Sequence, residues 1–237
     1  MTHPHIPYRP ARVAADEALA RGRALLAELE QRRSCRFFSD EPVPREAIEL
    51  AIRCASTAPS GAHRQPWRFV AVADPALKHA LRVAAEAEER ESYEGGRMTP
   101  EWLEALAPLG TTWQKPFLER VPWLVAVFEQ VHGVGADGST HKNYYVKESV
   151  GIACGLFIAA LHRMGLSTLT HTPSPMKFLG RILGRPANER PFILFPVGYP
   201  APDATVPDLR RRPLAEVSAW HVSPGPPVAP RTTSADP

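Results

Sequence analysis

The sequence predicts an α+β protein in which a mixed β-sheet is flanked by helices. Short runs typical of strands alternate with segments of helical periodicity. At 237 residues, 44% of them hydrophobic, the chain is long enough for one well-filled core. Its 26 prolines exceed the average share of about 5% and gather mostly toward the ends and turns. We therefore expect an extended arm over residues 1–14, one domain over 15–217, and a disordered Pro-rich tail over 218–237.

Two helices are predicted before the first strand. The first begins at Asp16 and ends at the basic pair Arg32-Arg33, since positive charge suits a helix C-terminus. The second begins near Pro44, carries apolar and charged residues on opposite faces, and stops at the breaker Ala58-Pro59-Ser60-Gly61. The run Trp67–Val72 then predicts a strand.

A helix and a surface excursion are predicted in the middle of the chain. Helical periodicity runs from Ala76 to about Glu94 and becomes strongly charged toward its end. Glycines, charges and Pro100 follow, and they indicate a mobile excursion. Excursions of this kind often carry function, so we expect an active-site lid over about residues 88–116.

The second half interleaves three strands with two helices. The strands are predicted at Trp123–Phe128, Leu166–Thr170 and Phe192–Val197, and the helices at Tyr144–Met164 and Phe178–Leu183. The longer helix is apolar nearly all round and rich in small residues. We therefore expect it to be buried against another element or another subunit.

Composition excludes several classes of protein. A net charge of +3 is too mild for a nucleic-acid surface, and no apolar run approaches the roughly 20 residues of a membrane span. The N-terminus lacks the layout of a secretory signal, and three cysteines cannot complete a disulfide framework. Neither the histidines nor the cysteines show metal-ligand spacing. We expect a cytoplasmic protein without a metal, a nucleic-acid partner or a membrane partner.

Two loops are candidates for ligand binding, and a third is not. Arg32-Arg33-Ser34-Cys35-Arg36 offers guanidinium groups and a hydroxyl to a phosphate, although a solvated helix end has the same composition. The small-residue loop 58–63 is either a plain turn or a place where backbone N–H groups approach a flat ligand. Gly133-x-Gly135-x-x-Gly138 matches a dinucleotide fingerprint only formally, because five residues separate it from the next helix.

Two further side-chain groupings leave alternatives open. Cys154 and His171 could form a nucleophilic pair, but a free cysteine on an apolar helix usually behaves as a small buried hydrophobe. Glu89 and Tyr93 are four residues apart and share a face if the helix persists. With Lys115 they could grip a zwitterion, or they could form an ordinary solvated surface.

Longer motifs occur between about Arg32 and Pro213, and the most specific are RRSCRFFSDEPVP, TAPSGAHRQPWRFV, YYVKESVGIACGL and ATVPDLRRRPL. By these motifs the sequence resembles the iodotyrosine deiodinases of the flavin-dependent nitroreductase superfamily. The resemblance implies a nitroreductase-like FMN-binding fold and an intertwined homodimer in which both subunits build each active site. Animal members carry an N-terminal membrane anchor that this sequence does not show, so a soluble bacterial-type version is implied.

The resemblance also implies how the cofactor is held. By this resemblance, the FMN phosphate and ribityl chain are bound by Arg32, Arg33, Ser34, Arg36 and Arg211. Ser60 is implied to lie against the flavin. Thr170, His171 and Thr172 match the segment that runs past the isoalloxazine, with the Thr172 hydroxyl on flavin N5 as the catalytic contact that tunes the flavin. His171 stands where the animal proteins have a hydroxyl residue.

The substrate and reaction follow from the same resemblance. Glu89, Tyr93 and Lys115 match the residues that grip the amino and carboxylate groups of a halotyrosine, and the Ala62 backbone N–H lies near its phenolate oxygen. The implied reaction reduces mono- and diiodotyrosine, with bromo- and chlorotyrosine as further candidates, to tyrosine and halide. A reductase or reduced nicotinamide would supply electrons. The alternatives are a general nitroreductase or quinone reductase, a flavin-destroying enzyme, and a flavin-binding protein without turnover.

Overall fold

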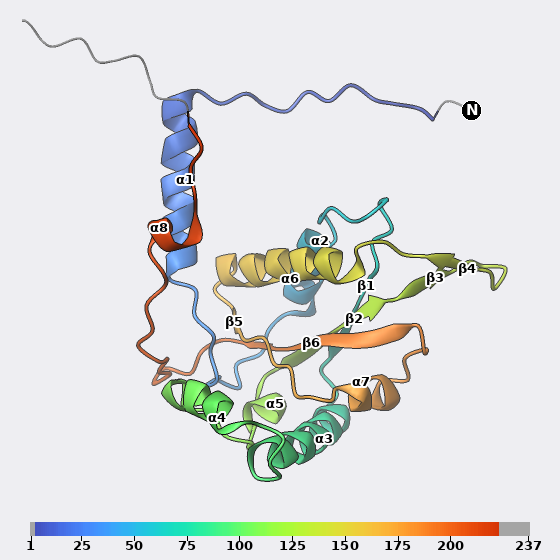
Figure 1. Cartoon of the computed structure of the whole chain (residues 1–237), viewed down its shortest axis with the longest axis vertical. Helices are drawn as coiled ribbons and strands as arrows, with labels where there is room; N and C mark the ends of the chain where they lie inside the picture. Colours follow the sequence, from blue (N-terminus) through green and yellow to red (C-terminus); the bar gives the residue numbers. More distant parts are fainter. Residues whose placement is uncertain (1–2, 223–237) are drawn as a thin grey trace, which may run out of the picture. The chain divides into compact units, whose positions relative to one another are not determined.

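A four-stranded antiparallel sheet lies at the centre of the larger of two structural units (Figure 1). The computed structural model describes residues 3–222, and the units are Met1–Pro207 and Asp208–Pro237. In sheet order, the strands are β1 (Trp67–Val72), β2 (Trp123–Gln130), β6 (Glu189–Gly198) and β5 (Ser167–Thr168). All three pairings within this sheet are antiparallel. Among the described residues, a parallel pairing occurs at the isolated bridge between Ser34 and Thr168.

Both faces of the sheet are buried, and β2 shows why. Leu124–Phe128 is an unbroken apolar run whose residues are all 0% exposed. Because successive side chains of a strand point to opposite faces, Val125 and Val127 enter one core while Leu124, Ala126 and Phe128 enter the other. The sheet is therefore the middle layer between two sets of helices.

The helices divide between the two faces, as Figure 1 shows. Helices α2 (Arg45–Ala55) and α6 (Val146–Arg163) cover one face. The other face is covered by α3 (Pro75–Tyr93), α5 (Phe117–Arg120) and α7 (Lys177–Ile182). The start of α3 is well defined, because the Leu77 N–H donates to Asp74 Oδ1 at 2.8 Å and Pro75 occupies the first turn.

The remaining elements lie outside this three-layer core. Helix α1 (Ala15–Glu30) contains no buried residue, and residues 3–14 before it form no helix or strand. Helix α4 (Pro100–Leu106) and the 3-10 turn η1 (Ala107–Leu109) follow α3, while β3 (His132–Val134) and β4 (Thr140–Lys142) form a hairpin. Helix α8 (Leu214–Val217) belongs to the second unit.

The α+β fold class is confirmed, but the four strands pair only antiparallel and not as the predicted mixed sheet. Several boundaries also differ from the sequence prediction. Helix α1 ends at Glu30, before the basic pair. The predicted strand at 166–170 shortens to β5, and α6 begins at Val146 because Tyr145 adopts a left-handed conformation (φ 48°). The predicted excursion contains α4 and η1. Residues 223–237, most of the predicted tail, lie outside the described residues.

No helix within residues 3–222 is long and apolar enough to cross a membrane. The same residues contain no cluster of three or more His, Cys, Asp or Glu side chains able to hold a metal ion.

The packing predicts that Phe157 is critical for stability. Its ring is fully buried and lies 5.5 Å from Phe69 and 5.2 Å from Phe195, centroid to centroid. We expect Phe157→Ala to lower the free energy of unfolding by about 3–5 kcal/mol, because the cavity cannot be filled from a covered sheet face. Equilibrium urea denaturation measures this. Val83→Ala, at a 53% exposed position, is the control, and equal losses in both variants would contradict the assignment.

Candidate active site

Glu89, Tyr93 and Lys115, which the sequence offered as a zwitterion grip, lie together in the structure. Lys115 Nζ is 3.2 Å from Glu89 Oε2 and 5.4 Å from the centroid of the Tyr93 ring. The Lys115 and Glu89 side chains are only 4% and 11% exposed. The solvated-surface reading is therefore wrong. We call these three residues the clamp.

Local structure explains two members of the clamp. Helix α3 continues through Tyr93, so Glu89 and Tyr93 lie one turn apart on the same face. Lys115 arrives from the segment after η1, which turns at Gly110 with a left-handed φ of 58°. Its Nζ also donates to Thr111 Oγ1 at 3.1 Å and to the Thr112 carbonyl oxygen.

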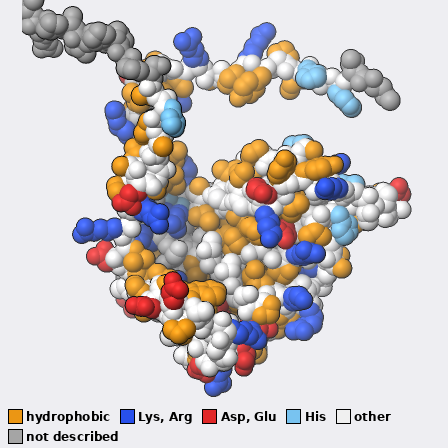
Figure 2. Space-filling view, in the orientation of Figure 1, with side chains coloured by type: hydrophobic (Ala, Val, Ile, Leu, Met, Phe, Trp, Pro, Cys, Tyr) orange, Lys and Arg blue, Asp and Glu red, His pale blue; other side chains and the backbone are white. Residues whose placement is uncertain are grey.

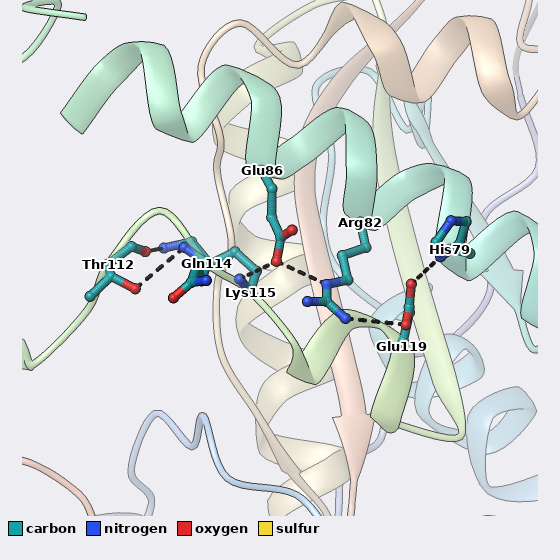
Figure 3. A network of polar contacts seen from close by, with 7 residues as sticks. All are labelled: His79, Arg82, Glu86, Thr112, Gln114, Lys115 and Glu119. Carbon is teal, nitrogen blue, oxygen red and sulfur yellow. Dashed lines mark hydrogen bonds and ion pairs between the residues drawn. The ribbon is translucent and has the colours of Figure 1, made fainter. Parts of the chain in front are cut away.

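A polar network ties the Lys115 segment to α3 (Figure 3). Glu86 Oε1 accepts from the Lys115 backbone N–H at 2.6 Å and from Arg82 Nε at 2.9 Å. Arg82 Nη1 in turn donates to Glu119 Oε2 at 3.2 Å, and the other oxygen of Glu119 lies 2.5 Å from His79 Nδ1. The network places Lys115 opposite Glu89.

Sequence reasoning missed this network. The spacing of Arg82 and Glu86 is that of a helical i,i+4 pair and could have been found. The contacts of Glu119 and of the Lys115 N–H connect segments that are far apart in the sequence. No local sequence pattern predicts such contacts.

Burial and charge act against each other in the clamp. Burial lowers the pKa of Lys115, and the neighbouring Glu89 carboxylate partly restores it. Burial raises the pKa of Tyr93, so its phenol stays protonated. Removing one partner from a buried ion pair is costly, because it leaves an uncompensated charge. A ligand that enters the clamp without such a cost must carry an ammonium for Glu89 and a carboxylate for Lys115.

The Arg32–Arg36 segment lines two different cavities. Cys35 N–H donates to the Thr168 carbonyl oxygen at 3.2 Å, which holds the segment extended beside β5. From Arg33 to Arg36 the side chains alternate between the two sides of the segment, as in an extended chain. Arg32, Arg33 and Cys35 line a cavity of about 510 Å³, whereas Ser34 and Arg36 line a second one of about 220 Å³. Cationic groups therefore face both sides of the segment.

The smaller cavity lies next to the clamp. Thr111 and Thr112, which bond Lys115, are among its lining residues, and so is Phe117. The positive charge of Arg36 lowers the pKa of Lys115 further. Among the predicted cofactor residues, Ser34 and Arg36 are thus close to the predicted substrate residues.

His171 lies buried beside this cavity. It is 5% exposed, its backbone pairs with Leu194, and its ring meets Phe117 edge to face at 5.9 Å between centroids. Its Nε2 has no hydrogen-bond partner. Burial, followed by the charges of Lys115 and Arg36, lowers the pKa of His171 to about 3, so the imidazole is neutral. The adjacent Thr170 and Thr172 are exposed.

The turn that carries Ser60 and Ala62 lies on the other side of the sheet. Ala62, His63 and Gln65 all have positive φ, from 48° to 53°. The Gly61 N–H donates to Ser149 of α6 at 3.3 Å, and a Cβ on Gly61 would come within 2.5 Å of the Tyr144 carbonyl oxygen. The α6 side of the sheet is opposite the α3 side that carries the clamp. One chain therefore does not bring Ala62 to the clamp.

The structure decides the sequence predictions for Cys154 and for the glycine fingerprint and leaves the prediction for Arg211 open. Burial raises the pKa of Cys154 to about 12, and the thiol packs in the α2–α6 core, so it is no nucleophile. Gly138 (φ 81°) forms the tip of the β3–β4 hairpin, which confirms that the fingerprint match is a plain loop. Arg211 belongs to the second unit, so its link to Arg32 and Arg33 stays a prediction.

The buried neutral His171 predicts acid sensitivity. Between its ordinary pKa of 6.5 and the folded pKa of about 3, the unfolded state binds more protons, so the free energy of unfolding falls as pH falls. The loss from this group reaches about 2 kcal/mol at pH 5. We expect His171→Thr to flatten the decline between pH 6.5 and 5, measured by urea denaturation. His5→Gln is the control, and an unchanged slope in His171→Thr would refute the assignment.

Comparisons with known proteins agree on one family. The Nitroreductase family matches residues 29–199. An iodotyrosine deiodinase of Haliscomenobacter hydrossis is 56% identical over 212 residues, which cover 90% of this chain and 95% of that protein. Human iodotyrosine deiodinase 1 is 46% identical over 216 residues, which cover 90% of this chain and 74% of that protein.

Solved structures point the same way. An iodotyrosine deiodinase bound to FMN and 3-iodo-L-tyrosine matches with a TM-score of 0.72 and 30% identity, covering 83% of this chain and 100% of that one. A BluB-like flavoprotein from Clostridium difficile, at 18% identity and a TM-score of 0.66, shares the fold alone. By the extent of the match and the level of identity, the chain belongs to the nitroreductase family and, within it, to the iodotyrosine deiodinases.

Proposed function

We propose that this protein catalyses the FMN-dependent reductive dehalogenation of halotyrosines, yielding tyrosine and halide. The observation that carries the proposal is the buried Glu89–Lys115 ion pair beside Tyr93. The relatives named iodotyrosine deiodinase, and the one crystallised with FMN and 3-iodo-L-tyrosine, support it. Iodotyrosines are the expected substrates, and bromo- and chlorotyrosine are further candidates.

The clamp favours a zwitterion over an uncharged aromatic. A halotyrosine brings an ammonium to Glu89 and a carboxylate to Lys115, so each buried charge exchanges one opposite charge for another. A nitroaromatic compound offers neither charge, and opening the pair for it leaves two unpaired groups. Tyr93, with its phenol protonated, packs beside the substrate backbone and can donate a hydrogen bond.

The residues present fit FMN. The guanidinium groups of Arg32 and Arg33 line the larger cavity with Ser167 and Thr168, and a phosphate needs such donors. We assign the phosphate and ribityl chain to Arg32, Arg33, Ser34, Arg36 and Arg211. The segment Thr170-His171-Thr172 would pass the flavin ring, with the buried unpartnered Nε2 of His171 at its middle. Bound FMN supplies the electrons that reduce the carbon–halogen bond.

Two threonines and a backbone group complete the assignment. Thr170 and Thr172 are both exposed, and we assign the Thr172 hydroxyl as the donor to flavin N5. Ser60 would lie against the flavin, and the exposed Ala62 backbone N–H would bind the phenolate oxygen. Neutral His171 adds no charge beside Arg36 and Lys115.

Residues 88–116 are proposed to act as a lid over the clamp. They include α4 and η1, and Trp102 of α4 is 51% exposed. Glu89, Tyr93 and Lys115 lie within or at the ends of this segment, so ligand binding and lid position are linked. Lid closure excludes water and strengthens the ion pairs with the substrate.

A homodimer is proposed to complete the site. Leu19, Leu25 and Leu26 of α1 are 59%, 50% and 58% exposed, and α1 buries no residue of its own. Hydrophobic side chains are also exposed over α6, as Figure 2 shows, including Ile152 and Leu156. Apolar surface of this kind marks an interface. In a twofold dimer, the Ala62 turn of one subunit can reach the clamp of the other.

Electrons would come from a reductase or a reduced nicotinamide, and we expect a cytoplasmic location.

The clamp assignment predicts a specific loss of activity. FMN-loaded protein reduced with dithionite under anaerobic conditions should convert 3-iodotyrosine to tyrosine and iodide. We expect the double variant Glu89→Gln, Lys115→Ala to lower kcat/KM at least about 100-fold, since two charge-assisted contacts are lost. Tyrosine and iodide are both measured.

Glu41→Gln, Lys177→Ala changes two exposed charges outside the lid and the clamp and is the matched control. Tyrosine formation that survives the clamp variant would contradict the assigned substrate contacts. Absence of tyrosine from the native protein, with ready reduction of a nitroaromatic compound, would instead establish the general nitroreductase alternative.

The dimer assignment predicts an assembly defect. We expect the native protein to sediment as a dimer and Leu25→Glu, Leu26→Glu to sediment as a monomer that retains less FMN, because charges are placed on the proposed interface. Sedimentation velocity with flavin absorbance measures both. Leu77→Glu, at a 38% exposed position of α3, is the control. A native monomer that binds FMN fully would overturn the dimer proposal.

A further inference from the structure

A third cavity, of about 540 Å³, lies between β1, the β3–β4 hairpin and the turn that joins α7 to β6. It shares no lining residue with the two cavities of the candidate active site. Nothing in the proposed function uses it. Its wall is polar, with side-chain amides, an imidazole and guanidinium groups from different elements.

The charges of this cavity are unbalanced. Arg64, Arg68 and Arg185 contribute three guanidinium groups to its lining, and Glu189 contributes the one carboxylate. The Glu189 side chain is 3% exposed and pairs with Arg185 Nε at 2.7 Å and Arg68 Nε at 3.4 Å. Gln130 Nε2 adds a hydrogen bond to the same carboxylate at 3.2 Å. One buried anion thus anchors two arginines and leaves an excess of positive charge.

Arg64 is the least committed of the three. It is exposed on the turn before β1, and the described residues provide it with no ion-pair partner. Arg68 keeps more than half of its side-chain surface, 54%, accessible. Both guanidinium groups can therefore bind a ligand with few protein contacts to break.

Asn143 and Asn188 form the rigid part of the wall. Asn188 Nδ2 donates to the His132 carbonyl oxygen at 2.9 Å, and Asn143 Nδ2 donates to the Gln130 carbonyl oxygen at 2.8 Å. Asn143 is only 6% exposed, and its Oδ1 has no hydrogen-bond partner. The Nδ2 bond sets the amide orientation, so the unused group of this buried side chain is an acceptor.

We propose that this cavity binds a phosphorylated small molecule, with its phosphate held by Arg64, Arg68 and Arg185. Guanidinium forks that approach from three elements match a tetrahedral anion with several oxygens, whereas a planar carboxylate is satisfied by one fork.

The volume extends the inference from the phosphate to the rest of the ligand. About 540 Å³ is far more than a phosphate group occupies and lies within the range of roughly 300–1,000 Å³ typical of small-molecule sites. The phosphate of FMN is assigned to the Arg32–Arg36 segment, so the two phosphate sites are separate.

Titration calorimetry with inorganic phosphate tests the proposal. The full FMN-loaded chain is used at constant ionic strength, so that the cofactor site is already filled. We expect saturable binding that weakens at least about tenfold in Arg64→Gln, Arg68→Gln, since two charged contacts are lost. Arg64→Gln alone, a change on an exposed turn, is expected to weaken binding several-fold without affecting folding. Arg53→Gln, Arg181→Gln removes two exposed arginines outside the cavity and is the matched control.

The outcomes separate this site from general charge effects. Weakening confined to the cavity variants, with an unchanged control, supports the proposal. No saturable binding up to millimolar phosphate overturns it, and so does an affinity unchanged by Arg64→Gln, Arg68→Gln. Citrate titrated in parallel should bind more weakly than phosphate, and equal or tighter citrate binding would overturn the phosphate assignment. Turnover of 3-iodotyrosine plays no part in these readouts, so this test stands apart from that of the proposed function.

Discussion

Burial of the sheet on both faces is the constraint from which the rest of the structure follows. The apolar run in β2 has no polar face, so helices must cover both sides of it. One side receives α2 and α6 with the Ser60–Gln65 turn, and the other receives α3 with the clamp. A site that needs both the turn and the clamp therefore requires two chains. The clamp is supported from the same side, since Leu81 and Ala85 of α3 are buried in the core on that face.

On this side of the sheet, a buried ion pair forms the centre of the clamp. Glu89 and Lys115 satisfy each other in the structure, and their side chains have almost no contact with water. Glu86 accepts a hydrogen bond from the Lys115 backbone N–H. This bond fixes the position of Lys115, although its segment follows an irregular turn. The pair excludes ligands that cannot replace both charges. Under the proposed function, this pair is the source of selectivity toward an amino acid in a fold whose other members share the sheet and helices.

Periodic patterns in the sequence predicted the elements well and the site in part. The helical spacing of α3 and the pair Glu89 and Tyr93 were readable, because both depend on residues one turn apart. Periodicity did not predict the nearness of Lys115, which was expected from side-chain chemistry and the family resemblance, since it depends on Gly110 and on the bond to Glu86. Sequence patterns also did not predict on which side of the Arg32–Arg36 segment each arginine lies. It follows from the bond of Cys35 to Thr168, which belongs to a strand far along the chain.

The sequence by itself determined the α+β class, the order of the main helices and strands, and the residue types able to bind a phosphate and a zwitterion. These follow from local periodicity and from side-chain chemistry, which need no knowledge of distant contacts. Only the tertiary structure decided that the clamp is buried, that His171 is neutral, and that Ala62 lies across the sheet from Lys115. Each of these depends on which segments meet in space, and long-range packing settles that where no local pattern records it.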